Sequence, residues 1–506
     1  MVTLIKHGMV LDGTGAPAVK CDLLIRSGRI VRIGSLANAA ADEVIDAVGN
    51  LVTPGFIDAG SHADRSGDLF TPAGSASLIT QGITSVIGGQ CGWSFAPWRT
   101  PTDATADVWR HPTNASVVWP SILDLFRFLE RMRLGVNFGT LVGSGALRLT
   151  AQGTSTCDAT ERDQRTFAHL LIAALREGAL GLSVGYGGDG VEFLSQHSLE
   201  SVARIVARAG GVIAVHLGAV PRALITDAHA VLEVSRAARV AVLFSHLTPR
   251  VSDAHRYGEL LTILEHVAGQ CDVHFDIQPL ETTQISLKHL VAASTDLHAS
   301  PDPLRPRSEA SERARRSGPD FRALAAHLPL GIVIDRVFDR SLQFLEGKTI
   351  DALAETRNRS PLETLGEVVR ITRGNATVLV RDVASIPLAA YLSSSRALVA
   401  TQGRGYRRRL APHEVQSDIF TAFLRWAASS GRVPLEAAVQ RLTGSAARVY
   451  HLRHRGVLRE GSAADVLVLD PETLRPSYVF VNGVCALRMG TLTGVCGGQV
   501  LRRDHR

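Results

Sequence analysis

The sequence of 506 residues is 45% hydrophobic and 20% charged, and its formal net charge is +6. This composition is typical of a globular protein, and the length allows a large domain with a smaller one beside it. The positive charge comes almost entirely from dispersed arginines, which form no basic stripe interleaved with aromatic residues, so a nucleic-acid partner is not expected.

The ends and the cysteines of the chain suggest where it works. The N-terminal segment MVTLIKHGMVLDGTG lacks the apolar core of a signal peptide, and no apolar run approaches the roughly 18 residues that a membrane helix needs. The six cysteines are scattered and form no close-spaced disulfide framework. We therefore expect a soluble, cytoplasmic protein with a small-molecule partner and no membrane partner, and the sequence leaves a homo-oligomer open.

Short strands and turns are predicted at both ends of the chain. The first fifty residues alternate apolar and polar positions around turns, and residues 461–471 and 476–490 have the same character. Two β-rich ends around a long middle predict one small β-sandwich domain, built from residues 1–52 and 455–506.

The middle of the chain, residues 53–454, repeats one pattern eight times. An apolar strand-like run ends in small or polar residues and is followed by a helical pattern, which is typical of a parallel sheet buried on both faces. Eight such units predict an α/β fold, specifically a (β/α)8 barrel. The eight runs cover residues 51–62, 84–92, 138–145, 178–187, 211–218, 240–247, 271–279 and 396–403.

Chemically active residues recur at the spacing of these units. His62 and Cys91 are 29 residues apart, and His216, His246 and Asp276 follow one another at intervals of 30. Each step is about one strand and one helix, so these residues should lie at the same height, at the carboxyl ends of the strands where barrel active sites are found.

An insertion is expected between the seventh and eighth strands, at about residues 283–345. Its residues 294–320 are polar, charged and proline-bearing. They suit either a lid over the mouth of the barrel or a plain surface excursion.

Several segments resemble a known family. The β-rich ends, the segment GGQCGWSFAP at residues 88–97 and the segment RGVLREGSAADVLVLD at residues 455–470 are similar to the amidohydrolase superfamily. The closest branch is that of the D-aminoacylases, or N-acyl-D-amino-acid deacylases. This resemblance covers nearly the whole chain and implies a metal-bearing barrel beside a small β-sandwich.

The resemblance implies a zinc site on Cys91, His216 and His246. A catalytic zinc takes three nitrogen or sulfur ligands and keeps a fourth position open, and these three residues meet that need. The second metal position of the family is degenerate, because Gly60 stands in place of one histidine and Gln402 in place of an aspartate. We therefore expect one zinc per chain.

Gln402 also changes the proton chemistry that the resemblance implies. The family uses an aspartate at this position as the general base, and a glutamine has no titratable proton near neutral pH. His62 is the best-placed substitute, because histidine is the side chain most suited to exchanging a proton near neutral pH. Asp276 suits either proton transfer or a structural role in holding a neighbouring histidine. Other carboxylates near strand ends are Asp64, Asp189 and Glu281.

The residues with which the family grips its substrate have changed as well. Gly218 and Thr248 stand in place of an arginine and a lysine, and Gln278 and Leu280 stand in place of two tyrosines. The usual D-amino-acid specificity is therefore not expected.

A cluster of arginines follows the eighth strand, with Arg404 and Arg407 among its members. Loops at this place in barrels often hold anions, and arginine suits carboxylate or phosphate, although a solvated basic loop explains the same residues. The leading hypothesis is a zinc-dependent enzyme that acts on a C–N bond, most simply an amide, of an unusual small molecule for which an anionic group is an option. The alternatives are a repurposed zinc site with non-hydrolytic chemistry (cyclisation, elimination, decarboxylation or acyl transfer) and a non-catalytic pseudoenzyme.

Overall fold

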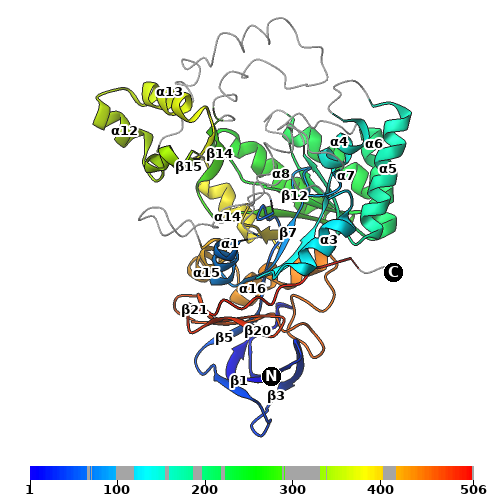
Figure 1. Ribbon diagram of the computed structural model, residues 1–506, viewed down its shortest axis with the longest axis vertical. Coiled ribbons are helices and arrows are strands. Elements are labelled where there is room, and N and C mark those ends of the chain that lie inside the picture. The colour runs from blue at the N-terminus through cyan, green and yellow to red at the C-terminus, as the bar shows by residue number, and fades with distance from the viewer. Residues whose placement is uncertain are drawn as a thin grey trace, which may run out of the picture.

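The structure is a computed structural model. It describes residues 1–64, 69, 71–98, 119–153, 159–185, 196–217, 223–287, 290, 331–337, 339–402 and 418–503. A β-rich part occupies one end of the molecule, and strands surrounded by helices make up the larger part (Figure 1).

Both ends of the chain contribute to one nine-stranded sheet, in the order β21-β20-β19-β18-β5-β1-β2-β3, with β4 pairing with β1. Strand β5 pairs antiparallel with β18, with Pro54 opposite Val466, so the two ends are joined inside the sheet. Apolar side chains such as Ile25, Val468 and Phe480 are buried together on it. The strands are β1 (Val2–Val10), β2 (Val19–Arg26), β3 (Arg29–Gly34), β4 (Glu43–Asp46), β5 (Leu51–Pro54), β18 (Val466–Leu469), β19 (Pro476–Val481), β20 (Val484–Arg488) and β21 (Thr491–Leu492).

The eight apolar runs of the middle segment all contain parallel strands. One sheet has the order β6-β7-β8, and another has the order β9-β10-β11-β12-β13-β17. All of these pairs are parallel. The strands are β6 (Phe56–Asp58), β7 (Ile83–Gly88), β8 (Asn137–Thr140), β9 (Val142–Gly143), β10 (Gly181–Gly185), β11 (Val212–His216), β12 (Ala241–Ser245), β13 (Val273–Ile277) and β17 (Ala397–Val399).

Backbone hydrogen bonds link these two sheets at both of their ends. Leu180 N donates to Thr140 O, just before β10 and at the end of β8. Gln402 N donates to Gly60 O at 3.1 Å, just after β17 and β6. The last strand of the series therefore lies beside the first.

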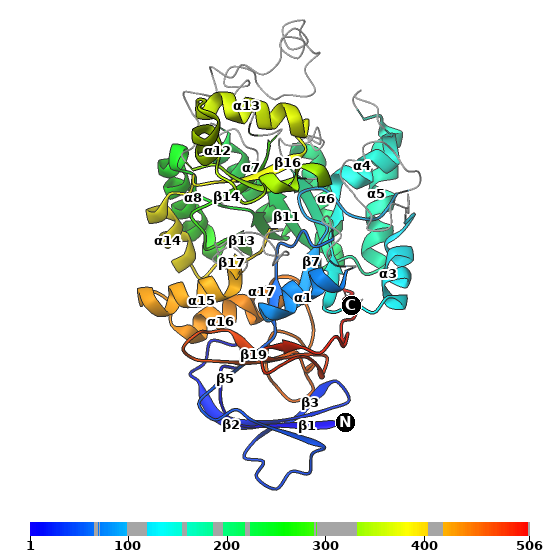
Figure 2. The ribbon, with the colours of Figure 1, turned by 60° about the vertical axis from the view of Figure 1, so that its left-hand side comes forward.

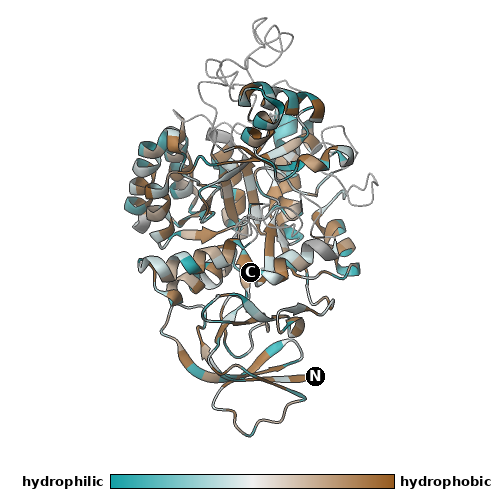
Figure 3. Ribbon diagram, turned by 90° about the vertical axis from the view of Figure 1, so that its left-hand side faces the viewer, coloured by the Kyte–Doolittle hydropathy of each residue, from teal (hydrophilic) through white to brown (hydrophobic). Residues whose placement is uncertain are grey.

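Helices alternate with these strands and cover them with their apolar faces. In α5, for example, Phe167, Leu171 and Leu175 are buried at intervals of four residues, and a capping box of Thr160 and Asp163 begins the helix. Figure 3 shows apolar strands in the middle of this part and two-toned helices around them. The helices are α1 (Pro72–Thr80), α3 (Ile122–Arg131), α4 (Ser144–Gln152), α5 (Glu161–Arg176), α6 (Gln196–Ala209), α7 (Leu224–Ala238), α8 (Ala254–His266), α14 (Ser385–Ser393), α15 (Ile419–Ser430), α16 (Leu435–Leu442) and α17 (Gly444–Val449), with short 3-10 turns at Val251–Asp253, Val267–Gly269 and Arg340–Leu345.

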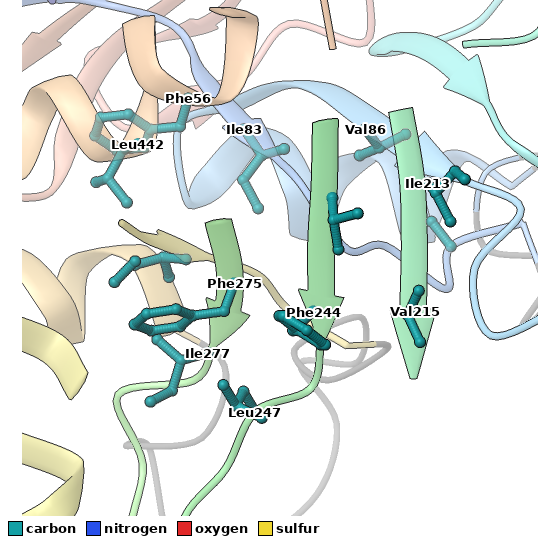
Figure 4. Packing of buried hydrophobic residues seen from close by; sticks show 14 of the residues in the cluster. Phe56, Ile83, Val86, Ile213, Val215, Phe244, Leu247, Phe275, Ile277 and Leu442 are labelled. Atoms are coloured by element: carbon teal, nitrogen blue, oxygen red, sulfur yellow. The ribbon is translucent and has the colours of Figure 1, made fainter. Parts of the chain in front are cut away.

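The core of this part consists of large side chains that successive strands place side by side. Phe244 and Phe275 from neighbouring strands are fully buried, and Ile213, Val215 and Ile277 lie beside them (Figure 4). In Figure 2, α15 and α16 lie between the nine-stranded sheet and β17, so the core continues toward the sheet. This packing fixes the strand ends on which the candidate site is built.

A third sheet interrupts the series between β13 and β17. It has the antiparallel order β14-β16-β15, made of β14 (Thr283–Ser286), β16 (Ala376–Val380) and β15 (Val333–Val337). Helices α12 (Ile350–Arg357) and α13 (Pro361–Thr372) share its apolar cluster. This unit extends to Val380 and so runs past the expected insertion of residues 283–345. The polar segment of residues 294–320 lies outside the described residues. None of the helices that the structure describes is long and apolar enough to span a membrane.

Candidate metal centre

The predicted ligands come from strand ends that the fold brings to one edge. His216 is the last residue of β11, His246 follows β12 directly, and Cys91 lies three residues after β7. His62 lies four residues after β6. Strands β6 and β7 belong to one parallel sheet and β11 and β12 to the other, and contacts among the four side chains show that these strand ends face a common space.

The ligand atoms lie close to one another. Cys91 Sγ is 3.0 Å from His246 Nε2 and 3.2 Å from His216 Nδ1. His62 Nε2 is 3.1 Å from His246 Nε2 and 3.8 Å from Cys91 Sγ. His62, Cys91 and His246 form a group in which all three ligand atoms lie within 4.8 Å of one another, and His216 joins it through Cys91.

These spacings fit a single zinc ion. In a tetrahedral site with Zn–N distances of about 2.0–2.1 Å and a Zn–S distance of about 2.3 Å, neighbouring ligand atoms lie about 3.3–3.6 Å apart. The four separations between 3.0 and 3.8 Å lie within about half an ångström of that range.

The electrostatics of the group favour a thiolate. Burial by itself would raise the pKa of the Cys91 thiol, but positive charge on His246 and His216 and hydrogen bonds from both rings outweigh burial and hold this pKa well below its usual range. Burial likewise would lower the pKa of His246, but negative charge at Cys91 and Asp276 raises it well above its usual range. The thiolate is the form of cysteine that binds a metal.

Asp276 holds His246 in place. Its Oδ1 accepts a hydrogen bond from the backbone N–H of His246 at 3.0 Å and lies 3.4 Å from His246 Nδ1. At 3.4 Å the second contact is electrostatic rather than a formed hydrogen bond, and it favours a proton on Nδ1, which leaves Nε2 for a metal. These contacts match the structural role, one of the two roles expected for Asp276. Its Oδ2 atom is buried and has no hydrogen-bond partner in the described part of the chain.

Gln402 joins this carboxylate rather than the ligand group. Its Nε2 donates to Asp276 Oδ1 at 3.1 Å. The backbone of Gln402 is left-handed, with φ of 51°, and those of Cys91 and His246 are left-handed as well, with φ of 56° and 58°. Such φ values are uncommon for residues other than glycine and cluster at functional sites, where the surrounding structure imposes them.

The buried carboxylate of Asp58, which the sequence did not single out, holds the residue that precedes Gln402. Asp58, at the end of β6, is fully buried and accepts hydrogen bonds from the backbone N–H and the hydroxyl of Thr401. Burial raises the pKa of Asp58, although these donors counteract the shift. The signal in the sequence is a lone aspartate inside the apolar run of residues 51–62. The hydrogen bonds between Asp58 and Thr401 join the first strand to the last beside the site.

The surroundings of Gly60, where the resemblance implies a metal ligand, are crowded. A Cβ atom added at Gly60 would lie 2.9 Å from Asp276 Oδ2 and 3.0 Å from the Cβ of Ala400. Both distances are shorter than ordinary contacts, and both neighbours are fully buried. The surrounding side chains therefore leave too little room for a residue larger than glycine at this position.

Gly60→Ala is expected to lower the free energy of unfolding by about 1–3 kcal/mol, because overpacked cores must shift to admit a methyl group. Gly258→Ala is the matched control, since nothing lies within 4 Å of a Cβ added there in α8, and it should be neutral or stabilise by up to about 1 kcal/mol. Denaturant unfolding of both variants in the same metal state measures the difference. Equal effects at the two positions would contradict the crowding at Gly60.

The other candidate residues are distributed as follows. Asp64 Oδ2 accepts the backbone N–H of Gly89, and Glu281 pairs with Arg381 and Ser385, so both carboxylates have structural partners. Gln278 is buried and donates to Thr401 O, while Thr248 and Leu280 are also buried. The remaining residues, Asp189, Gly218, Arg404 and Arg407, lie outside the described residues, and the expectations for them stay predictions.

Known proteins are similar to this chain over nearly its whole length, although no family model matches the sequence. The chain is 29% identical to an N-acyl-D-glutamate deacylase of Alcaligenes xylosoxydans xylosoxydans, over 99% of this chain and 96% of the relative. It is 26% identical to a D-aminoacylase of the same organism, over 99% and 97% of the two chains. A crystal structure of the N-acyl-D-glutamate deacylase of Bordetella bronchiseptica, in complex with zinc and a phosphonate inhibitor, matches with a TM-score of 0.80 at 24% identity, over 99% of each chain.

The chain is thus similar over nearly its whole length to hydrolases that act on amide C–N bonds, the class that the sequence predicts. Within that class the chain is similar over nearly its whole length to the D-aminoacylases and N-acyl-D-amino-acid deacylases, and the predicted resemblance is confirmed.

Proposed function

We propose that this protein is a zinc-dependent enzyme that hydrolyses a C–N bond, most simply an amide, of a small molecule other than the common N-acyl-D-amino acids. The observation that carries the proposal is the convergence of Cys91, His216, His246 and His62 at the carboxyl ends of four strands. The alignments over nearly the whole chain to deacylases support the choice of an amide.

We also infer that the eight strand-helix units form a closed (β/α)8 barrel, residues 53–454, beside a β-sandwich of residues 1–52 and 455–506. The hydrogen bond from Gln402 N to Gly60 O, together with the Asp58–Thr401 pair, supports closure between the first and last strands. The pairing of β5 with β18 supports one small domain from both ends of the chain.

One zinc per chain would be held by Cys91, His216 and His246. When bound, zinc supplies a Lewis acid that polarises a carbonyl and activates water. Asp276 supports this function by fixing the ring of His246 through its backbone and its Nδ1 atom.

His62 is the residue that we assign to proton transfer. Its Nε2 faces the same point as the zinc ligands, 3.1 Å from His246 Nε2, so it reaches a substrate group bound there. Asp276 is the alternative, although it is fully buried and its Oδ1 is already engaged.

A second candidate function is non-hydrolytic chemistry at the same zinc. The observation that favours it is the hydrogen bond from Gln402 Nε2 to Asp276, which places a neutral amide where the resemblance implies a carboxylate base. A site without that base suits cyclisation, elimination, decarboxylation or acyl transfer.

Zinc-dependent release of amine from a panel of linear and cyclic amides tests the proposal, with the zinc-depleted variant Cys91→Ala as the reference. Amine release that requires zinc supports hydrolysis. Bound zinc without amine release from any amide would favour the second function, and a protein without zinc at neutral pH would favour a non-catalytic role.

Ordinary N-acetyl-D-amino acids are expected to be poor substrates, because Thr248, Gln278 and Leu280 stand where the resemblance implies a lysine and two tyrosines that bind substrate. The side chain of Leu280 is apolar, and that of Gln278 is buried and bonded to Thr401 O. The measurement is steady-state turnover of N-acetyl-D-methionine by the zinc-loaded protein. Turnover near about 10 per second, a typical enzyme rate, would contradict this expectation. The arginine cluster with Arg404 and Arg407 remains our candidate grip for an anionic substrate.

A further inference from the structure

Thr401, the residue before Gln402, has its N–H, its hydroxyl and its carbonyl all bonded to buried partners. The N–H donates to Asp58 Oδ1 at 2.9 Å, and the hydroxyl donates to Asp58 Oδ2. The carbonyl accepts a hydrogen bond from Gln278 Nε2. Asp58, Thr401 and Gln278 are each at most 3% exposed. The segment that leads into Gln402 is therefore held from two sides, away from water.

The two sides belong to strands that are far apart in the sequence. Gln278 follows β13 directly, and Ala400 N donates to Ile277 O, the last residue of that strand, at 3.2 Å. On the other side, Gln402 N donates at 3.1 Å to the carbonyl of Gly60, which lies two residues after β6. This stretch of chain is therefore fixed between β6 and β13, the first strand of the series and the strand that carries Asp276.

The hold on Thr401 accounts for the unusual backbone of Gln402. A φ of 51° is unfavourable for a residue with a side chain, so it persists only where the surroundings impose it. The bonds to Thr401 and the bond from Gln402 N supply that constraint. It sets the direction of the Gln402 side chain, whose Nε2 donates to Asp276 Oδ1 at 3.1 Å.

The same contacts continue to the candidate metal centre. Asp276 Oδ1 accepts the N–H of His246 at 3.0 Å and lies 3.4 Å from its Nδ1 atom. A carboxylate only accepts hydrogen bonds, so the nitrogen of Gln402 faces it and the oxygen of Gln402 is left as an acceptor. A continuous chain of contacts thus leads from Asp58 through Thr401, Gln402 and Asp276 to His246.

We propose that Asp58 and Thr401 are positioning residues of the metal centre. They hold the backbone of Gln402 so that its amide nitrogen faces Asp276, and through Asp276 they fix the ring of His246. The inference rests on the proposed zinc centre and adds to it two fully buried residues that act only through Gln402.

Thr401→Val tests the proposal, because it removes the hydroxyl that Asp58 holds and changes the size of the side chain little. We expect the Kd for zinc, measured by competition with a chelator, to rise about tenfold, the lower end of the range for groups that orient metal ligands. The visible absorption of the cobalt(II)-loaded protein should shift as well, since it depends on the geometry of the ligands. Thr401→Ser keeps the hydroxyl and should restore both values toward those of the parent.

Thr372→Val is the matched control, since Thr372 is also buried and its hydroxyl donates to Val368 O within α13. It should leave the zinc Kd and the cobalt spectrum unchanged. Gln402→Ala should raise the Kd by about the same factor as Thr401→Val. The double variant Thr401→Val/Gln402→Ala should be no weaker than Gln402→Ala, because residues that act through one another are not additive.

An unchanged zinc Kd and cobalt spectrum in Thr401→Val, an equal change in Thr372→Val, or additive effects in the double variant would each overturn the proposal. Melting temperatures verify folding. If Thr401→Val does not fold, Asp58→Asn takes its place in the same measurements, because it keeps the size of Asp58 and removes the acceptor for the Thr401 hydroxyl.

A parent protein that binds no metal would refute the proposed zinc centre, and a crystal structure of Thr401→Val would then decide this inference by itself. Retention of the hydrogen bond from Gln402 Nε2 to Asp276 in that structure would overturn the inference, and loss of the bond would support it.

Discussion

Cys91→Ala is expected to lose most of the zinc that the parent protein holds, with a fall in affinity on the order of 100-fold or more, because it removes the thiolate that lies within 3.8 Å of three imidazole nitrogens. The parent should retain about one zinc per chain after exhaustive dialysis, measured by elemental analysis. Cys21→Ala is the matched control, since Cys21 lies on β2 in the nine-stranded sheet.

Two equivalents of zinc in the parent, or none, would refute the single-metal site. The first result would mean that the places of Gly60 and Gln402 still admit a second ion in spite of the crowding around Gly60. The second would remove the basis for any zinc-dependent reaction. Because the space around Gly60 is already filled by its neighbours, Gly60→His should not raise the zinc content above that of the parent.

Gln402→Asp is expected to lower the native activity by about tenfold or more and to bring no gain in amide hydrolysis. The substitution removes the donor to Asp276 Oδ1 at 3.1 Å and sets a second carboxylate beside a buried one. Two adjacent carboxylates repel, so one of them takes up a proton and does not act as a free base. A loss of about 1.4 kcal/mol in the transition state corresponds to the tenfold change.

Gln402→Asn is the matched control for this experiment, because asparagine has the size of aspartate and remains neutral. Steady-state rates on an amide from the panel, for both variants and the parent, separate the effect of charge from the effect of length. If the protein is instead a hydrolase weakened only by its missing base, Gln402→Asp should gain about 10²–10⁴-fold in hydrolysis while Gln402→Asn does not. Such a gain, with native activity intact, would show that the site has not been retuned.

Much of the arrangement follows from local patterns in the sequence. Near-continuous apolar runs followed by helical segments predict parallel strands, and each of the eight runs contains one. The intervals of 29 and 30 residues between the histidines, Cys91 and Asp276 predict a common edge, because one strand and one helix return the chain to that edge. Cys91, His216 and His246 do meet there.

Other features depend on contacts between segments that no local pattern relates. The sequence singled out His62 for proton transfer, but only the tertiary structure places its Nε2 3.1 Å from His246 Nε2, inside the ligand group. The two roles open to Asp276 could not be separated from its spacing alone, whereas its hydrogen bond to the backbone of His246 gives it a holding role.

The sequence by itself determined the order of the strands along the chain and the set of candidate ligands, and it placed Gly60 and Gln402 where the resemblance implies ligands of a second metal. Only the tertiary structure decided that Asp276 fills the space beside Gly60 and that Asp58 and Thr401 join the first strand to the last. The physical reason is the distance along the chain over which each kind of interaction acts. Hydrophobic periodicity acts over a few residues, while the direction and partners of a side chain at a strand end are set by left-handed backbone turns and by neighbours hundreds of residues away.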